Sequence, residues 1–110
     1  MSAFRVAFVT IAADKAEELS ERLVENQLAA CVNIVKDICS VYRWDGEVTK
    51  DNESLMIIKT AANKIESMIK FVKENHPHDI PEVISLDIAE GNPDYLNWVH
   101  KETWHAVQKG

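Results

Sequence analysis

The dipeptide Asp45-Gly46 stands between two long extended runs and constrains the fold more than any other feature of the sequence. The runs are residues 30–44, rich in Val, Ile, Tyr and Trp, and residues 47–60, which end in the apolar segment 55–60. Asp-Gly in this position is typical of a type I′ turn, because both central residues adopt positive φ. Lys36-Asp37 interrupts the first run, where we expect a bend or bulge. The centre of the chain is therefore predicted to be a long β-hairpin.

Three further segments have the apolar spacing of amphipathic helices, with hydrophobic residues three and four positions apart. Asp14 and Asn63 are predicted to cap the first two helices at their N-termini. Asn92 is predicted to cap the third, with Pro93 at its first helical position. The predicted helices cover residues 14–26, 63–74 and 92–104.

Two more strands complete the pattern. Residues 4–11 are apolar on both faces, which predicts a central strand covered on both sides. Pro77 and Pro81 exclude a helix between them. Residues 82–89 alternate between apolar and polar side chains, so we expect a strand with one face in the core. The apolar members of that strand are Ile84, Leu86 and Ile88.

The resulting order is strand, helix, strand, strand, helix, strand, helix. Its first six elements form the βαββαβ pattern of an α+β, ferredoxin-like sandwich, to which an extra C-terminal helix is added. Residues 1–110 are predicted to form a single domain. Right-handed crossovers place both early helices on one face of the sheet and leave the other face open. Because that open face carries apolar side chains, we expect the chain to oligomerise.

Composition excludes several classes of protein. The chain has 12 Lys and Arg against 18 Asp and Glu, a net charge of −6, with no basic run. Nucleic-acid binding is therefore not expected, since it requires a basic face. No apolar run approaches the roughly 18 residues of a membrane span, and no signal-peptide pattern is present. We expect a cytoplasmic protein whose Cys31 and Cys39 are reduced and too far apart on one strand to share a metal ion.

Six short stretches are spread in order over nearly the whole chain: Leu28–Asn33, Tyr42-x-Trp44-x-Gly46, Ile57–Thr60, Phe71–Pro77, Pro81–Ile84 and Gly91–Trp98. Together these stretches resemble the CutA family, which is named for divalent-cation tolerance. The resemblance implies a ferredoxin-like subunit in a tight homotrimer, in which the long hairpin extends a neighbour's sheet. It also implies a role in tolerance of copper or other divalent cations. The architecture resembles the trimeric PII signalling proteins too, which bind small effectors between subunits.

His76 and His78 are the candidate metal ligands. In an extended His-Pro-His segment, alternate side chains point the same way, so both imidazoles could contact one cation. Copper(II) favours imidazole. The alternative is that His76 interacts with the carbonyl groups at the end of the preceding helix. Metal-binding relatives can use a Cys near the end of the first strand and two consecutive His before the Pro. This chain has Thr10 and Asn75-His76 there, so we expect weak binding and no obligatory cofactor.

A second candidate is a small-molecule cleft between subunits. Lys59 and Glu82 lie at strand ends, where an ammonium and a carboxylate can hold a small ligand. Tyr42, Trp44 and Tyr95 are the candidate walls of this cleft. The alternative is that Lys59 and Glu82 form a structural ion pair.

An enzyme is not expected. No Ser-His-Asp or Cys-His arrangement has local support in the sequence, and no Gly-rich phosphate loop is present. The connection after the first strand, residues 10–14, also lacks glycine, which argues against an anion-cradling loop. The sequence therefore predicts a divalent-cation tolerance protein that binds metal ions, and the alternative is a PII-like trimer that binds a small molecule.

Overall fold

The structure, a computed structural model, describes residues 2–104, and its elements follow the predicted order. Two single 3₁₀ turns, Ala13–Lys15 and Ala62–Lys64, precede the first two helices. The ends of the predicted domain, residue 1 and residues 105–110, lie outside the described part. The strands and helices are β1 Phe4–Ala12, α1 Ala16–Glu25, β2 Cys31–Trp44, β3 Glu47–Ala61, α2 Ile65–Asn75, β4 Ile84–Asp87 and α3 Pro93–Thr103.

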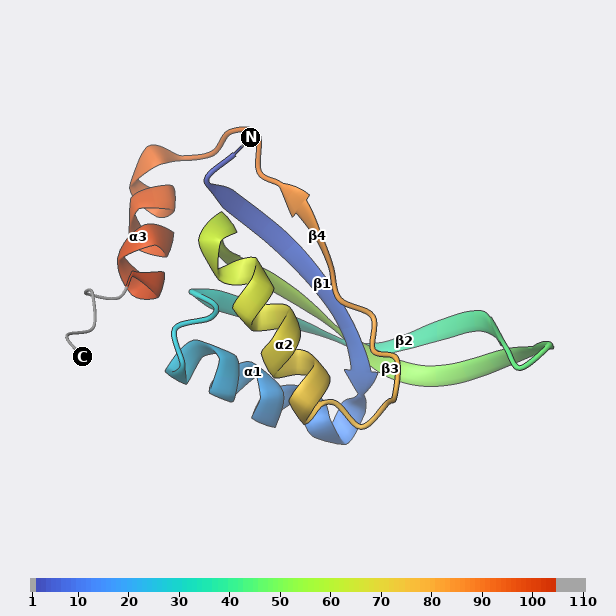
Figure 1. Ribbon diagram of the computed structural model, residues 1–110. Coiled ribbons are helices and arrows are strands. Elements are labelled where there is room, and N and C mark those ends of the chain that lie inside the picture. The colour runs from blue at the N-terminus through green and yellow to red at the C-terminus, as the bar shows by residue number, and fades with distance from the viewer. Residues whose placement is uncertain (1, 105–110) are drawn as a thin grey trace.

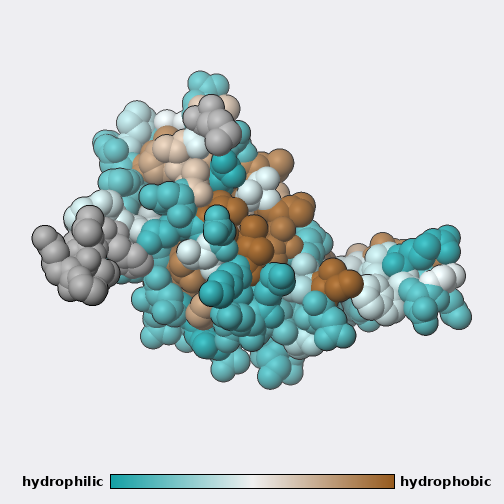
Figure 2. Space-filling view, viewed as in Figure 1, coloured by the Kyte–Doolittle hydropathy of each residue, from teal (hydrophilic) through white to brown (hydrophobic). Residues whose placement is uncertain are grey.

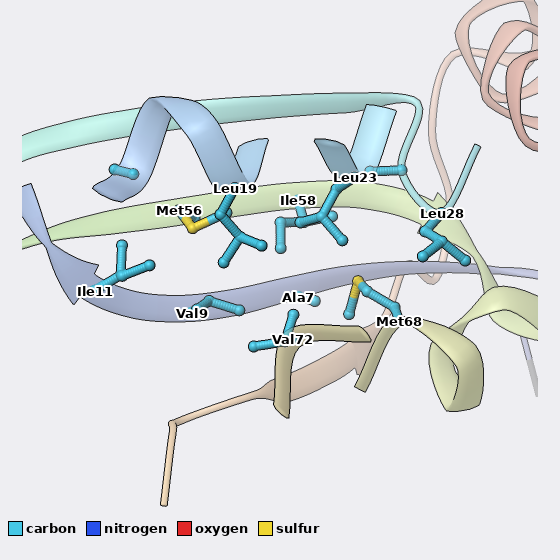
Figure 3. Packing of buried hydrophobic residues seen from close by; sticks show 12 residues of the cluster. Ala7, Val9, Ile11, Leu19, Leu23, Leu28, Met56, Ile58, Met68 and Val72 are labelled. Carbon is cyan, nitrogen blue, oxygen red and sulfur yellow. The ribbon is translucent and has the colours of Figure 1, made fainter. Parts of the chain in front are cut away.

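The sheet has four antiparallel strands in the order β2-β3-β1-β4, as the ferredoxin-like pattern predicts. Helices α1 and α2 lie against one face of it, whereas α3 lies at one end of the sheet (Figure 1). The core fills the space between these two helices and the sheet (Figure 3). None of the helices in residues 2–104 is long and apolar enough to cross a membrane. Fully buried core residues include Val9, Ile11, Leu23, Met56, Ile58, Met68 and Val72.

Two of the three predicted helix caps are wrong. Asp14 and Asn63 lie inside the 3₁₀ turns, and α1 and α2 begin after them without a side-chain cap. A 3₁₀ turn at a helix start is common, and it moves the first α-helical residue along the chain. The third cap is confirmed, since Asn92 Oδ1 accepts a hydrogen bond of 3.0 Å from the Asp94 N–H. Pro93 occupies the first turn of α3 as predicted.

The predicted hairpin and its bulge are both confirmed. Asp45 and Gly46 have φ of 51° and 81°, as a type I′ turn requires. The β2–β3 register shifts between Val35 and Ile38, and Asp37 adopts a φ of 59°. One extra residue on β2 reverses which of its side chains face each side of the sheet. Beyond the bulge, the even-numbered residues of β2 therefore point to the face away from α1 and α2.

This second face of the sheet is apolar and has no helix layer over most of its area. Ile84 and Leu86 lie on it, opposite Phe8 and Val6, and are 54% and 56% exposed. The prediction that the apolar side of this strand packs into the core is therefore wrong within the subunit. The reason is the register, because Ile84 and Leu86 pair with Phe8 and Val6, whose side chains point away from the helices. Hydrophobic side chains also reach the surface beside α2 and β4 (Figure 2). We call this second face the open face; its apolar members include Val6, Phe8, Val35, Leu55, Ile57, Ile84 and Leu86.

Candidate functional site

A cleft of about 660 Å³ lies where the open face meets the segment that joins α2 to β4. Thr10 of β1, Glu53 of β3 and the far half of β2 form one side. The 77–82 segment forms the other; Pro77 and Pro81 exclude a helix there, and the chain bends at residues 77–80. Residues from four distant parts of the sequence thus line one hollow. Those that matter for its chemistry are Tyr42, Trp44, Glu53, His78, Asp79 and Glu82.

The bulge on β2 places the aromatic side chains in this cleft. Beyond it, Ile38 pairs with Glu53, and the following even-numbered residues, Tyr42 and Trp44, share the face of the Glu53 carboxylate. Without the extra residue, both rings would point to the opposite side. The Tyr42 hydroxyl donates to the Asp51 carboxylate, and this bond is the main reason that the pKa of Tyr42 is raised. The hydrogen bond to Asp51 holds the Tyr42 ring in place.

His76 is buried, and both of its ring nitrogens form hydrogen bonds. Nε2 lies 2.8 Å from the Thr10 carbonyl oxygen, and Nδ1 accepts a 3.0 Å bond from the His78 N–H. Because Nδ1 accepts a hydrogen bond and Nε2 faces a carbonyl oxygen, the ring is assigned as the neutral tautomer with its proton on Nε2. His76 is the first residue after α2, but its ring bonds to β1 rather than to the helix carbonyls. It therefore ties the start of the 77–82 segment to β1.

His78 has a different environment. Its side chain is exposed and lines the cleft, with its ring centroid 4.9 Å from that of His76. No hydrogen bond to the ring of His78 occurs within residues 2–104. The two imidazoles do lie close together, as the His-Pro-His pattern predicts, although residues 77–80 bend rather than extend. Only His78 has ring nitrogens without a hydrogen bond in residues 2–104.

The predicted cleft residues fall into two groups. Tyr42, Trp44 and Glu82 line the cleft, and Glu82 also accepts a long 3.4 Å hydrogen bond from the Thr10 hydroxyl. Lys59 and Tyr95 lie elsewhere in the subunit, so the alternative Lys59–Glu82 ion pair does not form within it.

The second group gathers around Cys31, at the end of the sheet nearest α3. Lys59 donates to the Asn33 side chain and stands opposite Cys31 on the neighbouring strand. Tyr95 packs on Trp98, with ring centroids 5.6 Å apart. Burial, followed by the Cys31 thiol, raises the pKa of Tyr95. Cys31 and Cys39 are both free thiols, on one strand.

Glu53 lies in the cleft without any local sequence signal that marks it. It is only 6% exposed, yet it lines the cleft and has no hydrogen bond or ion pair within the described chain. Its position becomes visible only with the strand register, which places it between Ala12 and Ile38. No group of three His, Cys, Asp or Glu side chains in residues 2–104 is arranged to hold a metal ion.

Comparison with known proteins gives consistent matches. The sequence model of the CutA1 divalent ion tolerance protein family matches residues 5–102. The Protein CutA of Mus musculus is 45% identical over 105 residues; these cover 94% of this chain but only 59% of the mouse protein. The divalent-cation tolerance protein CutA of Thermus thermophilus is 42% identical, with 89% of this chain and 96% of that protein covered.

Solved structures agree with the sequence matches. The crystal structure of CutA1 from Oryza sativa superposes with a TM-score of 0.91 at 40% identity, covering 96% of this chain and 97% of that one. The Thermus thermophilus Cut A1 structure gives 0.89 at 41% identity, covering 92% and 99%.

Proposed function

The chain belongs to the CutA1 divalent ion tolerance protein family, and we propose that it acts in divalent-cation tolerance by binding a divalent cation weakly in the cleft described above. The exposed His78 ring, which lines this cleft beside the carboxylates of Asp79 and Glu82, is the observation that carries the proposal. Imidazole and carboxylate are both ligands for divalent transition metals, and copper(II) binds most tightly among them. The divalent-cation names of the relatives favour this function over the PII-like alternative.

His78 is the proposed direct contact, and His76 supports it. A cation shared by both imidazoles would have to displace one of the two hydrogen bonds of the His76 ring, either the Nε2 bond to the Thr10 carbonyl or the bond that Nδ1 accepts from the His78 N–H. Either displacement leaves a backbone group without its partner, which costs about 1–3 kcal/mol where the group is buried. This penalty is one reason to expect weak affinity, and the scarcity of further ligands is another. The His76–His78 pair thus remains our proposed metal site, with unequal roles for its members.

Titration calorimetry with copper(II) tests this proposal. Tag-free protein at about 0.15 M salt, which screens nonspecific attraction to a chain of charge −6, is expected to bind one ion per subunit. The H78A variant should lose most of this binding. The H100A variant, which removes an exposed imidazole from α3, should bind as the wild type does. Unchanged binding in H78A would contradict the site.

We also propose that the protein is a homotrimer located in the cytoplasm, without enzymatic activity or an obligatory cofactor. The open face supports assembly, because a contiguous apolar sheet surface usually marks an interface. Ile84 and Leu86, each more than half exposed in the single subunit, are the residues that a neighbour would cover. Native mass spectrometry of freshly purified protein would report the number of subunits together with any bound metal or small molecule. A purely monomeric spectrum would contradict the assembly.

A further inference from the structure

Glu53 is unusual for an acid in how little of it is exposed. The residue is 94% buried by accessible area, and no described residue hydrogen-bonds to it or pairs with its charge. Its carboxylate oxygens are not among the enclosed side-chain atoms that lack a hydrogen-bond partner, so they reach the space of the cleft that Glu53 lines. A group that enters the cleft and carries positive charge would pair with this carboxylate.

The surroundings of Glu53 differ from those of a metal site. No three metal-ligating side chains come together in residues 2–104, and a cleft of about 660 Å³ is many times larger than an ion. Its walls are instead aromatic and aliphatic, formed by Tyr42, Trp44 and Ile80. Aromatic faces attract organic cations through the negative potential of the ring, and they also bury hydrocarbon.

We propose that this cleft binds an organic ammonium compound, with the ammonium group at Glu53 and the hydrocarbon part against Tyr42 and Trp44. An ammonium group has up to three N–H donors, and the hydroxyl-bearing Thr10 and Ser40 line the same cleft as further acceptors. The Tyr42 hydroxyl is already bonded to Asp51, so its ring acts as a wall. This ligand class is separate from the divalent cation proposed at His78.

Calorimetry with three matched small molecules tests this inference. n-Butylammonium, 1-butanol and butyrate have similar hydrocarbon chains but carry positive, zero and negative charge. We expect only butylammonium to bind the wild-type protein, and E53Q to weaken that binding at least tenfold, because the charged hydrogen bond is lost. The W44A variant should weaken it severalfold. E66Q, which neutralises an exposed acid on α2, is the charge-matched control and should bind normally.

Copper(II) titration of the same variants separates this inference from the proposed function. E53Q should keep copper binding through His78, and H78A should keep butylammonium binding. Equal binding of butylammonium to wild type and E53Q would overturn the inference, as would equal binding of 1-butanol. A third result would also overturn it: butylammonium does not bind, and E53Q weakens subunit assembly. In that case a cationic side chain of a second copy would be the partner of Glu53.

Discussion

The two faces of the sheet are built from the same strands but differ in almost every other respect. On the helix-covered face, Val9, Met56 and Ile58 are completely buried within one subunit. On the open face, Ile84 and Leu86 remain more than half exposed, although they are equally apolar. One face therefore stabilises the subunit, whereas the other is available for partners and ligands.

The polar side chains discussed above lie on the open face rather than on the helix-covered face. Thr10, Glu53 and Lys59 all point to the open face, by the register of β1 and β3. The cleft forms at one end of this face and the cluster around Cys31 at the other. Candidate chemistry is thus concentrated on the side that the subunit does not use for its own core.

The largest effect is expected for truncation on the helix-covered face. Ile58→Ala removes a fully buried side chain and should lower the free energy of unfolding by about 2–5 kcal/mol, because it leaves a cavity. Ile84→Ala, the matched change on the open face, should cost far less in a subunit kept monomeric. Urea unfolding of both variants measures this difference. Equal losses under monomeric conditions would show that the two faces do not differ as described.

A charge placed on the open face should act on assembly. Leu86→Asp puts a carboxylate into a surface that we propose is covered by a neighbouring subunit, and an unpaired charge there is strongly unfavourable. Light scattering is expected to show at least a tenfold weaker association, while circular dichroism shows an unchanged fold. Glu66→Asp on α2 serves as a conservative surface control. Intact oligomers in Leu86→Asp would place the interface elsewhere.

A smaller effect is expected at the bulge that brings Tyr42 and Trp44 onto the open face. Asp37 has a φ of 59°, which glycine adopts freely and β-branched residues adopt with strain. Asp37→Val should therefore destabilise the protein by roughly 1–2 kcal/mol, whereas Asp37→Gly should change stability little. Thermal unfolding of the two variants measures this. If Asp37→Gly is the more destabilised variant, the backbone strain is not the controlling factor.

The smallest effect concerns Tyr95, at the opposite end of the open face. Burial raises its folded-state pKa above the ordinary value of 10.0, so the folded protein favours the protonated phenol. This contribution is complete below pH 10.0 and is lost as the pH rises through the folded-state pKa. Denaturation midpoints from pH 8 to 11 should fall less steeply in Tyr95→Phe than in the wild type. An unchanged pH profile would show that Tyr95 does not contribute to the loss of stability at alkaline pH.

Much of the fold could be predicted because it depends on local signals. The Asp45-Gly46 turn, the bulge at Asp37 and the cap at Asn92 are each determined by residues close in sequence. The caps at Asp14 and Asn63 were wrong because a 3₁₀ turn competes with side-chain capping at these helix starts.

The site was harder to predict because it depends on register. Glu53 is one of several acids in a long strand, and only pairing with Ala12 and Ile38 shows that it lies in the cleft. The same pairing places Lys59 opposite Cys31, away from Glu82. His76 and His78 were found by their spacing, but their unequal roles follow from hydrogen bonds to backbone groups, which spacing does not reveal.

We propose that a divalent cation contacts this chain at the cleft through His78 while His76 holds the segment in place. Nitrogen-15 NMR of the imidazole rings during titration with zinc(II), a diamagnetic divalent probe, tests it most directly. We expect the His76 signals to show a proton on Nε2 and an acceptor at Nδ1, unchanged by metal, while the His78 ring signals shift. A metal-induced change at the His76 nitrogens with none at His78 would contradict the claim.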